Sequence, residues 1–79
     1  MKLLVRNLSR ATTEHDLRTL FTQYGKVTTC NLVLDKESGQ SKGFAFVEMP
    51  SKIESENAIK ALNQANIDKS KIRVKHADA

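Results

Sequence analysis

Alternation of apolar and polar residues marks four segments of the chain as strands. Residues 2–6, 27–34, 42–49 and 72–76 each show a period of two, and in the second of these segments Cys30, Leu32 and Leu34 share the side predicted to face inward. Because successive side chains of a strand point to opposite faces, each segment is predicted to have a buried side and an exposed side. Leu4 is the one apolar residue on the otherwise charged side of the first segment.

Two further segments predict helices. Thr13 opens a capping-box pattern, and apolar residues follow it at one helical stripe: Leu17, Leu20, Phe21 and Tyr24. Ser51 begins a second pattern of this kind after Pro50, in a helix predicted to run to about residue 62. Its predicted inward residues are Ala58, Ile59, Ala61 and Leu62. The polar residues 35–41 and 63–71 are predicted to be connections.

The order β-α-β-β-α-β predicts a ferredoxin-like α+β fold, with a four-stranded antiparallel sheet and two helices on one face. The helices leave the other face open to solvent. The inward set is Leu3, Val5, Cys30, Leu32, Ala45, Val47, Met49, Ile72 and Val74. The outward set is Lys2, Leu4, Arg6, Asn31, Val33, Phe44, Phe46, Glu48, Arg73 and Lys75.

The alternative register of the third strand would bury Phe44 and Phe46 and expose the residues between them. A slip of one residue produces it. It would also bury Glu48, and an unpaired carboxylate in a small core is strongly unfavourable. The alternation therefore predicts that both phenylalanines lie on the open face.

Composition limits the class of protein. The 79 residues predict one domain spanning 1–79, and 13 basic against 9 acidic residues leave a net charge of +4, which suits an anionic partner but does not require one. The single Cys30 cannot form an internal disulfide, as expected in a reducing compartment. The N-terminus has too few consecutive apolar residues for a signal peptide or a membrane span. An intracellular protein is predicted, cytoplasmic, or nuclear in a eukaryote, without membrane association.

Catalytic and metal-binding patterns are missing from the sequence. His15 is predicted to be a solvated helix residue, and His76 is either a surface residue or a ligand contact. Neither has a second histidine or cysteine at ligand spacing. No serine has a visible histidine–carboxylate partnership, and no glycine-rich phosphate loop occurs. The sequence therefore predicts no enzyme, metal or cofactor.

Two exposed phenylalanines among lysines and arginines predict a surface for single-stranded nucleic acid. Unpaired bases stack on aromatic rings for about 1–3 kcal/mol each, while basic side chains hold the phosphates. Bases that are already paired and stacked do not bind in this way.

The same stretch carries a family resemblance. Residues 42–49, KGFAFVEM, resemble the octapeptide signature of the RNA-recognition motif (RRM) family and depart from it only at Met49. Residues 3–8, LLVRNL, resemble the family's hexapeptide signature, with Leu4 at an ordinarily aromatic position. The whole chain resembles an RRM domain, although Gln64 and Lys69 stand where the family often has glycine.

The resemblance implies a role at each matching position. Phe46 would stack a base, Phe44 would contact a base or sugars, and Lys42 would pair with a phosphate. Glu48 would accept a hydrogen bond from a base amino group. The predicted RNA-binding residues are Lys2, Leu4, Arg6, Asn31, Lys42, Phe44, Phe46, Glu48, Arg73, Lys75, His76 and Ala77.

The resulting prediction is a monomeric module for single-stranded RNA, and for single-stranded DNA as well. The alternative is a protein-interaction module on the same fold. Such modules usually lose the octapeptide aromatics, and this chain keeps both. A methionine at the start of the first strand favours a small stand-alone protein, and an excised domain is the alternative.

Overall fold

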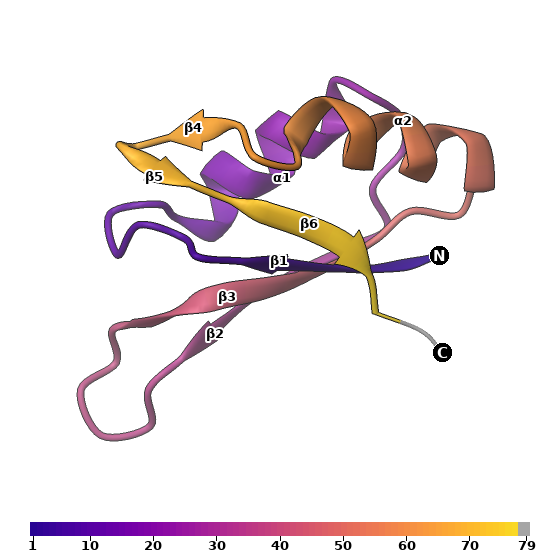
Figure 1. Ribbon diagram of the computed structural model, residues 1–79. Helices are drawn as coiled ribbons and strands as arrows, with labels where there is room; N and C mark the ends of the chain where they lie inside the picture. Colours follow the sequence, from indigo (N-terminus) through magenta and orange to yellow (C-terminus); the bar gives the residue numbers. More distant parts are fainter. Residues whose placement is uncertain (78–79) are drawn as a thin grey trace.

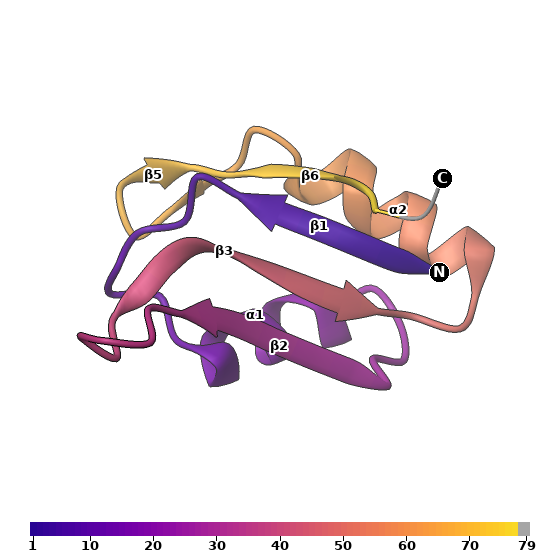
Figure 2. The ribbon, with the colours of Figure 1, turned by 90° about the horizontal axis from the view of Figure 1, so that it is seen from below.

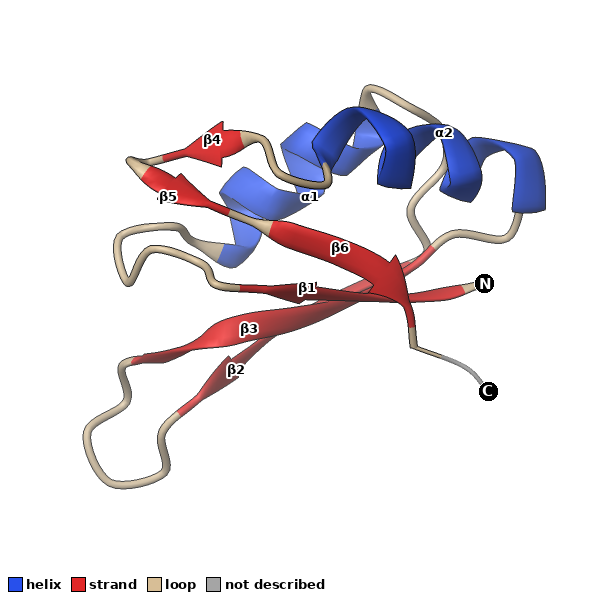
Figure 3. Ribbon diagram, viewed as in Figure 1, coloured by secondary structure: helices blue, strands red, loops and turns tan. Residues whose placement is uncertain are grey.

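A computed structural model describes residues 1–77 of the protein as two layers, a β-sheet and a pair of helices (Figure 1, Figure 3). The strands and helices are β1 (Lys2–Arg6), α1 (Glu14–Thr22), β2 (Thr29–Leu34), β3 (Ser41–Glu48), α2 (Lys52–Leu62), β4 (Asn66–Ile67), β5 (Ser70–Lys71) and β6 (Arg73–His76). The predicted domain extended to residue 79, and its last two residues lie outside the described residues.

The main sheet has the strand order β2-β3-β1-β6, and every neighbouring pair is antiparallel. Seen from below, its four strands lie in front of both helices, so the helices cover one face only (Figure 2). This arrangement confirms the predicted ferredoxin-like fold. The two strands that carry the signature-like segments, β1 and β3, are the central pair.

The core lies between the sheet and the helices, and the inward set is confirmed there. Eight of its nine members are buried: Leu3, Val5, Cys30, Ala45, Val47, Met49, Ile72 and Val74. Leu32 is only partly buried and packs against the cluster. From α1, Leu17 and Phe21 complete the core as the helical stripe predicted. The phenylalanines of β3 are not part of this core.

Both helices begin as their N-cap patterns predict. At α1 the capping box is complete, because Thr13 and Asp16 bond each other's backbone N–H groups at 3.1 Å. At α2 only half of the box forms, since the Ser51 hydroxyl accepts from the Glu54 N–H. The Glu54 carboxylate accepts instead from the Lys26 N–H, and so ties α2 to the loop after α1.

Several local expectations were wrong. The second strand begins at Thr29 rather than at residue 27, the third is Ser41–Glu48 rather than 42–49, and the fourth begins at Arg73 rather than at residue 72. A register shift follows Leu32, so that Leu34 is 51% exposed although alternation placed it inward. Ala61 is exposed, because it lies off the buried stripe of α2, which consists of Ser55, Ala58 and Leu62. The buried Ser55 hydroxyl donates to the Lys52 carbonyl at 2.8 Å.

A short hairpin formed by β4 and β5 occupies the segment predicted as a polar turn. Asp68 and Lys69 form its tip with φ of 50° and 68°, the left-handed conformation that two-residue hairpin loops require. Gln64 also has a positive φ, 71°. Gln64, Asp68 and Lys69 therefore adopt a backbone conformation that favours glycine, although each has a side chain.

Candidate nucleic-acid interface

Phe44 and Phe46 form an aromatic pair on the open face of β3. Their ring centroids are 6.1 Å apart and their planes are almost perpendicular, at 89°, which is a favourable edge-to-face geometry. Each ring is half-buried, so it keeps an exposed surface while its neighbours restrict its motion. The ammonium group of Lys2 lies 4.8 Å from the centroid of Phe46. A cation is thus already paired with the face of one ring.

Strand pairing places Phe46 in a row across the sheet. Phe46 lies opposite Asn31 on β2 and opposite Leu4 on β1. Leu4 in turn lies opposite Lys75 on β6. Paired residues of antiparallel strands share a face, so these four side chains, from four different strands, line the open face together. Leu4 is half-buried and occupies the position beside the ring.

A second row marks one end of this face. Glu48 lies opposite Lys2 on β1 and opposite Thr29 on β2. Its carboxylate is exposed and is the one acidic group of the predicted outward set. The N–H of Ala77 donates to the Lys2 carbonyl at 2.8 Å, so the segment after β6 continues beside this row.

His76 is separated from the other predicted contacts. It lies opposite Leu3, whose side chain is buried on the helix-covered side. Because paired residues share a face, the register directs the exposed His76 side chain to that side as well. A contact from this residue to a ligand on the open face would therefore use its backbone.

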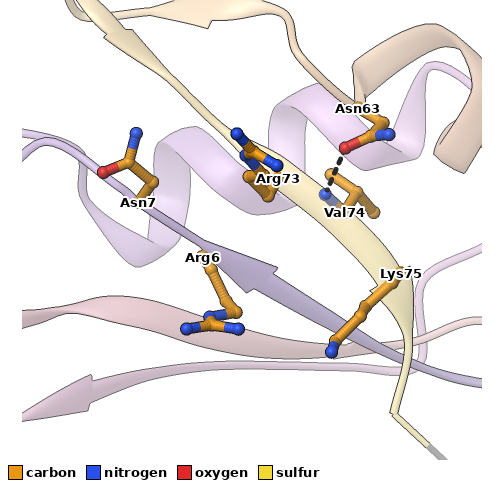
Figure 4. Close-up of a pocket in the computed structure, with 6 residues that line it drawn as sticks. All are labelled: Arg6, Asn7, Asn63, Arg73, Val74 and Lys75. Atoms are coloured by element: carbon orange, nitrogen blue, oxygen red, sulfur yellow. Dashed lines mark hydrogen bonds between the residues drawn. The ribbon is translucent and has the colours of Figure 1, made fainter.

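The opposite end of the open face is basic and hollowed. Arg6 and Arg73 lie opposite each other on β1 and β6. With Lys75, they line a hollow of about 640 Å³, and Figure 4 shows the Arg6 and Lys75 side chains extending from their strands. The remaining lining residues are Asn7, Asn63 and Val74. Among the described residues, no carboxylate lines this hollow.

Asn63 and Asn7 belong to this hollow, and sequence reasoning missed both. The Asn63 side-chain oxygen accepts from the Val74 N–H at 3.1 Å (Figure 4). Its amide nitrogen therefore remains as a donor at the hollow. Asn7 follows β1 with a φ of 59°, and its amide donates to the Lys71 carbonyl at 2.7 Å. A polar residue directly after a strand was the available signal for Asn7.

A family model described as RNA recognition motif matches residues 3–73. The chain belongs to the RNA recognition motif family. The segments that resemble the two RRM signatures lie on the central strands of the sheet, where Phe46 is opposite Leu4. Met49, the departure from the octapeptide, is fully buried and belongs to the packing of the RRM core.

RRM proteins from several organisms are similar to this chain. RNA-binding protein CP29B, chloroplastic, of Arabidopsis thaliana is 42% identical over 78 residues, which cover 99% of this chain and 27% of the relative. Glycine-rich RNA-binding protein 1 of Mycosarcoma maydis is 40% identical over 99% of this chain and 45% of its own length. The chain therefore spans about a quarter of one relative and less than half of the other.

Solved structures show the same RRM architecture. The crystal structure of RNA Binding Protein PG1 matches with a TM-score of 0.95 and 38% identity, covering all of this chain and 95% of that one. A structure described as a Sxl-lethal protein/RNA complex matches with a TM-score of 0.93 and 33% identity, over 99% of this chain and 47% of that chain.

Ionisable groups away from the open face have perturbed pKa values. Burial, with the nearby Glu14 carboxylate, raises the pKa of the Cys30 thiol, which disfavours its reactive thiolate form. Backbone N–H groups of Ser38 and Glu37 lower the pKa of Asp35. These shifts are consistent with structural roles. Neither helix of the described residues is long and apolar enough to cross a membrane.

Proposed function

We propose that this protein binds single-stranded RNA on the open face of its sheet. The observation that carries the proposal is the Phe44–Phe46 pair, two partly exposed rings on a face that also presents Lys2, Arg6 and Lys75. Buried packing does not require large aromatic residues at these positions, whereas unpaired bases stack on such rings. The edge-to-face contact holds the pair in place before a ligand arrives.

The row across the sheet suggests how the ligand lies. A base stacks on Phe46, and its neighbours contact Asn31 on one side and Leu4 on the other. Lys75 lies at the far end of this row. Phe44 contacts a second base or the sugars between the two. A strand of about three to five nucleotides fits the width of such a sheet.

Polar residues complete the proposed site. Lys42, Arg6 and Arg73 hold phosphates at the basic end of the face. Glu48 disfavours a phosphate near it and accepts a hydrogen bond from a base amino group. The backbone at His76 and Ala77 contacts base edges beside Lys2. The relatives named as RNA-binding proteins and the solved complex with RNA support RNA as the ligand.

The finer parts of the proposal follow from the same chemistry. Stacking and phosphate contacts do not need a 2′-hydroxyl group, so single-stranded DNA is a second, weaker ligand. The protein acts as a monomeric binding module within one domain and without catalysis. It works inside the cell, in the cytoplasm or in a eukaryotic nucleus, where the unpaired Cys30 stays reduced.

Titration of the isotope-labelled protein with random-sequence RNA octamers tests the proposal. The backbone amide shifts of Leu4, Phe44 and Phe46 are expected to change most, and those of α1 and α2 least. With about three or four phosphates neutralised, log K falls with log salt at a slope of roughly −2 to −3. Affinity that does not depend on salt, or shifts confined to the helices, would contradict it. DNA octamers measure the contribution of the 2′-hydroxyl groups.

A further inference from the structure

A second hollow, of about 330 Å³, lies beside Phe44, where β1 ends and β3 begins. Its lining includes Arg6, Asn7, Arg10, Lys42, Gly43 and Phe44. Three cations therefore meet next to an aromatic ring, and within residues 1–77 no carboxylate lines this hollow. Arg10 belongs to the loop between β1 and α1, and neither signature segment contains it.

The two hollows share Arg6 and Asn7. They therefore form one continuous surface at this end of the sheet, which we call the basic band. It consists of Lys75, Arg73, Arg6, Arg10 and Lys42. Like charges gathered in this way repel one another, so the arrangement favours an anion that lies along them.

A backbone hydrogen bond holds the loop of Arg10 against β3. The Leu8 N–H donates to the Gly43 carbonyl at 2.8 Å. Gly43 has a φ of 86°, a conformation that side chains rarely adopt, and a Cβ atom there would lie 3.5 Å from the Leu8 carbonyl oxygen. The close approach of these two segments brings Arg10 to the same hollow as Lys42.

The far side of the same loop is fixed to the β4–β5 hairpin. The buried Thr12 hydroxyl donates to the Asp68 carboxylate at 2.6 Å, and the Asn7 amide donates to the Lys71 carbonyl. The backbone around Arg10 is therefore held from two directions. A cation on a held loop loses less conformational entropy on binding than one on a free loop.

We infer that Arg10 binds a backbone phosphate of the RNA, as one member of the basic band. This inference rests on the proposed function and adds to it the path of the sugar–phosphate backbone. The band lies at one end of the open face and Glu48 lies at the other. Phosphates therefore follow the band, and bases extend from it over Phe44 and Phe46 towards Glu48.

Two carboxylates of the described residues lie near Arg10: Asp35, whose pKa responds to its charge, and Glu14, which lines a further hollow with it. Arg10 contributes to the lowered pKa of Asp35, after the larger effect of the Ser38 and Glu37 N–H groups. Those two N–H groups donate to the same oxygen, Oδ1 of Asp35, at 3.1 and 2.8 Å. The Asp35 carboxylate is thus engaged in its own loop, and the Glu14 carboxylate accepts from the Leu32 N–H at 3.1 Å. The Arg10 guanidinium remains available to a phosphate.

The experiment compares the R10Q variant with R18Q, which removes the same charge from the exposed side of α1. Binding of a fluorescent random-sequence RNA octamer is measured across a series of salt concentrations. R10Q is expected to reduce the slope of log K against log salt by about 0.7, the value for one phosphate contact, and to weaken binding about three- to tenfold. R18Q is expected to keep the wild-type slope.

A third variant, R10K, separates charge from structure. It keeps the cation and is expected to keep the wild-type slope, whereas a slope reduced as in R10Q would indicate a structural role and overturn the inference. Equal slopes for R10Q and R18Q, with wild-type binding that still depends on Phe46, would overturn the inference alone. Failure of the wild-type protein to bind the octamer would overturn the proposed function together with it.

Discussion

The two sides of strand β3 differ in a way that stability does not explain. Ala45 and Val47 face the helices and are fully buried, whereas the larger Phe44 and Phe46 face outward and stay partly exposed. Burial of a large aromatic side chain is among the most stabilising contributions a core can receive. Phe21 is fully buried and stabilises the core in this way, whereas the two phenylalanines of β3 do not. The outward rings therefore point to a ligand.

The open face of the sheet also differs from the helix-covered side in charge. The predicted binding face carries five cations and one carboxylate: Lys2, Arg6, Lys42, Arg73 and Lys75, with Glu48. The helices are not basic, since α1 contains two acids and one arginine and α2 contains two acids and two lysines. The positive charge of the chain is thus concentrated where the aromatic pair lies. An anionic ligand is directed to one face.

The largest expected effect is on stability, from a substitution in the core. Phe21→Ala is expected to lower the free energy of unfolding by about 3–5 kcal/mol, because it removes a fully buried ring and leaves a cavity. Urea unfolding followed by circular dichroism measures it. The matched control is Phe46→Ala, which removes the same side chain from the outer side. Equal losses of stability in the two variants would remove the distinction between the faces.

The next effect concerns binding. Phe46→Ala is expected to weaken RNA affinity by about 1–3 kcal/mol, because one stacking surface is lost. Its loss of stability is expected to be smaller than that of Phe21→Ala, because the ring is only half-buried. Fluorescence anisotropy with an RNA octamer measures the affinity. Unchanged affinity in a folded variant would show that the ring is not a stacking surface.

A gain on the outer face is expected from Leu4→Phe. The new ring would lie on β1 opposite Phe46 and offer a further surface to a base. One added stacking contact strengthens RNA binding by about 1 kcal/mol, roughly fivefold. Leu3→Phe is the matched control, since the adjacent buried position has no room for a larger side chain and the variant is expected to lose stability. Weaker RNA binding by Leu4→Phe would indicate that leucine suits another contact.

The smallest effect tests a turn that belongs to neither face. Gln64 has a φ of 71°, which costs a residue with a side chain about 1–2 kcal/mol. Gln64→Gly removes this strain but adds flexibility to the unfolded chain, so a net stabilisation of about 0.5–1 kcal/mol is expected. Thermal unfolding measures it.

Gln23→Gly is the control for that substitution. Gln23 lies at the end of α1 with a φ of −63°, where glutamine is unstrained. Glycine there is expected to lower stability, because only the entropic effect remains. If both glycine variants were destabilised, strain at Gln64 would be too small to matter.

Local patterns in the sequence determined the four strands of the main sheet to within two residues, where the helices begin, and which side of β3 its phenylalanines occupy. Alternation has a period of two along a single strand, so it needs no knowledge of distant residues. Periodicity gave the wrong burial at two positions, one on a strand and one on a helix. It placed Leu34 inward beyond a register shift, and Ala61 inward where a hydrogen-bonded Ser55 is buried instead.

Only the tertiary structure decided which side chains become neighbours. The strand order sets Asn31, Phe46, Leu4 and Lys75 in one row, although they are far apart along the chain. It also brings the loop of Arg10 to Lys42 through a backbone hydrogen bond between distant segments. Such contacts depend on long-range strand pairing and loop packing. Sequence periodicity does not predict these contacts, because it describes each strand by itself.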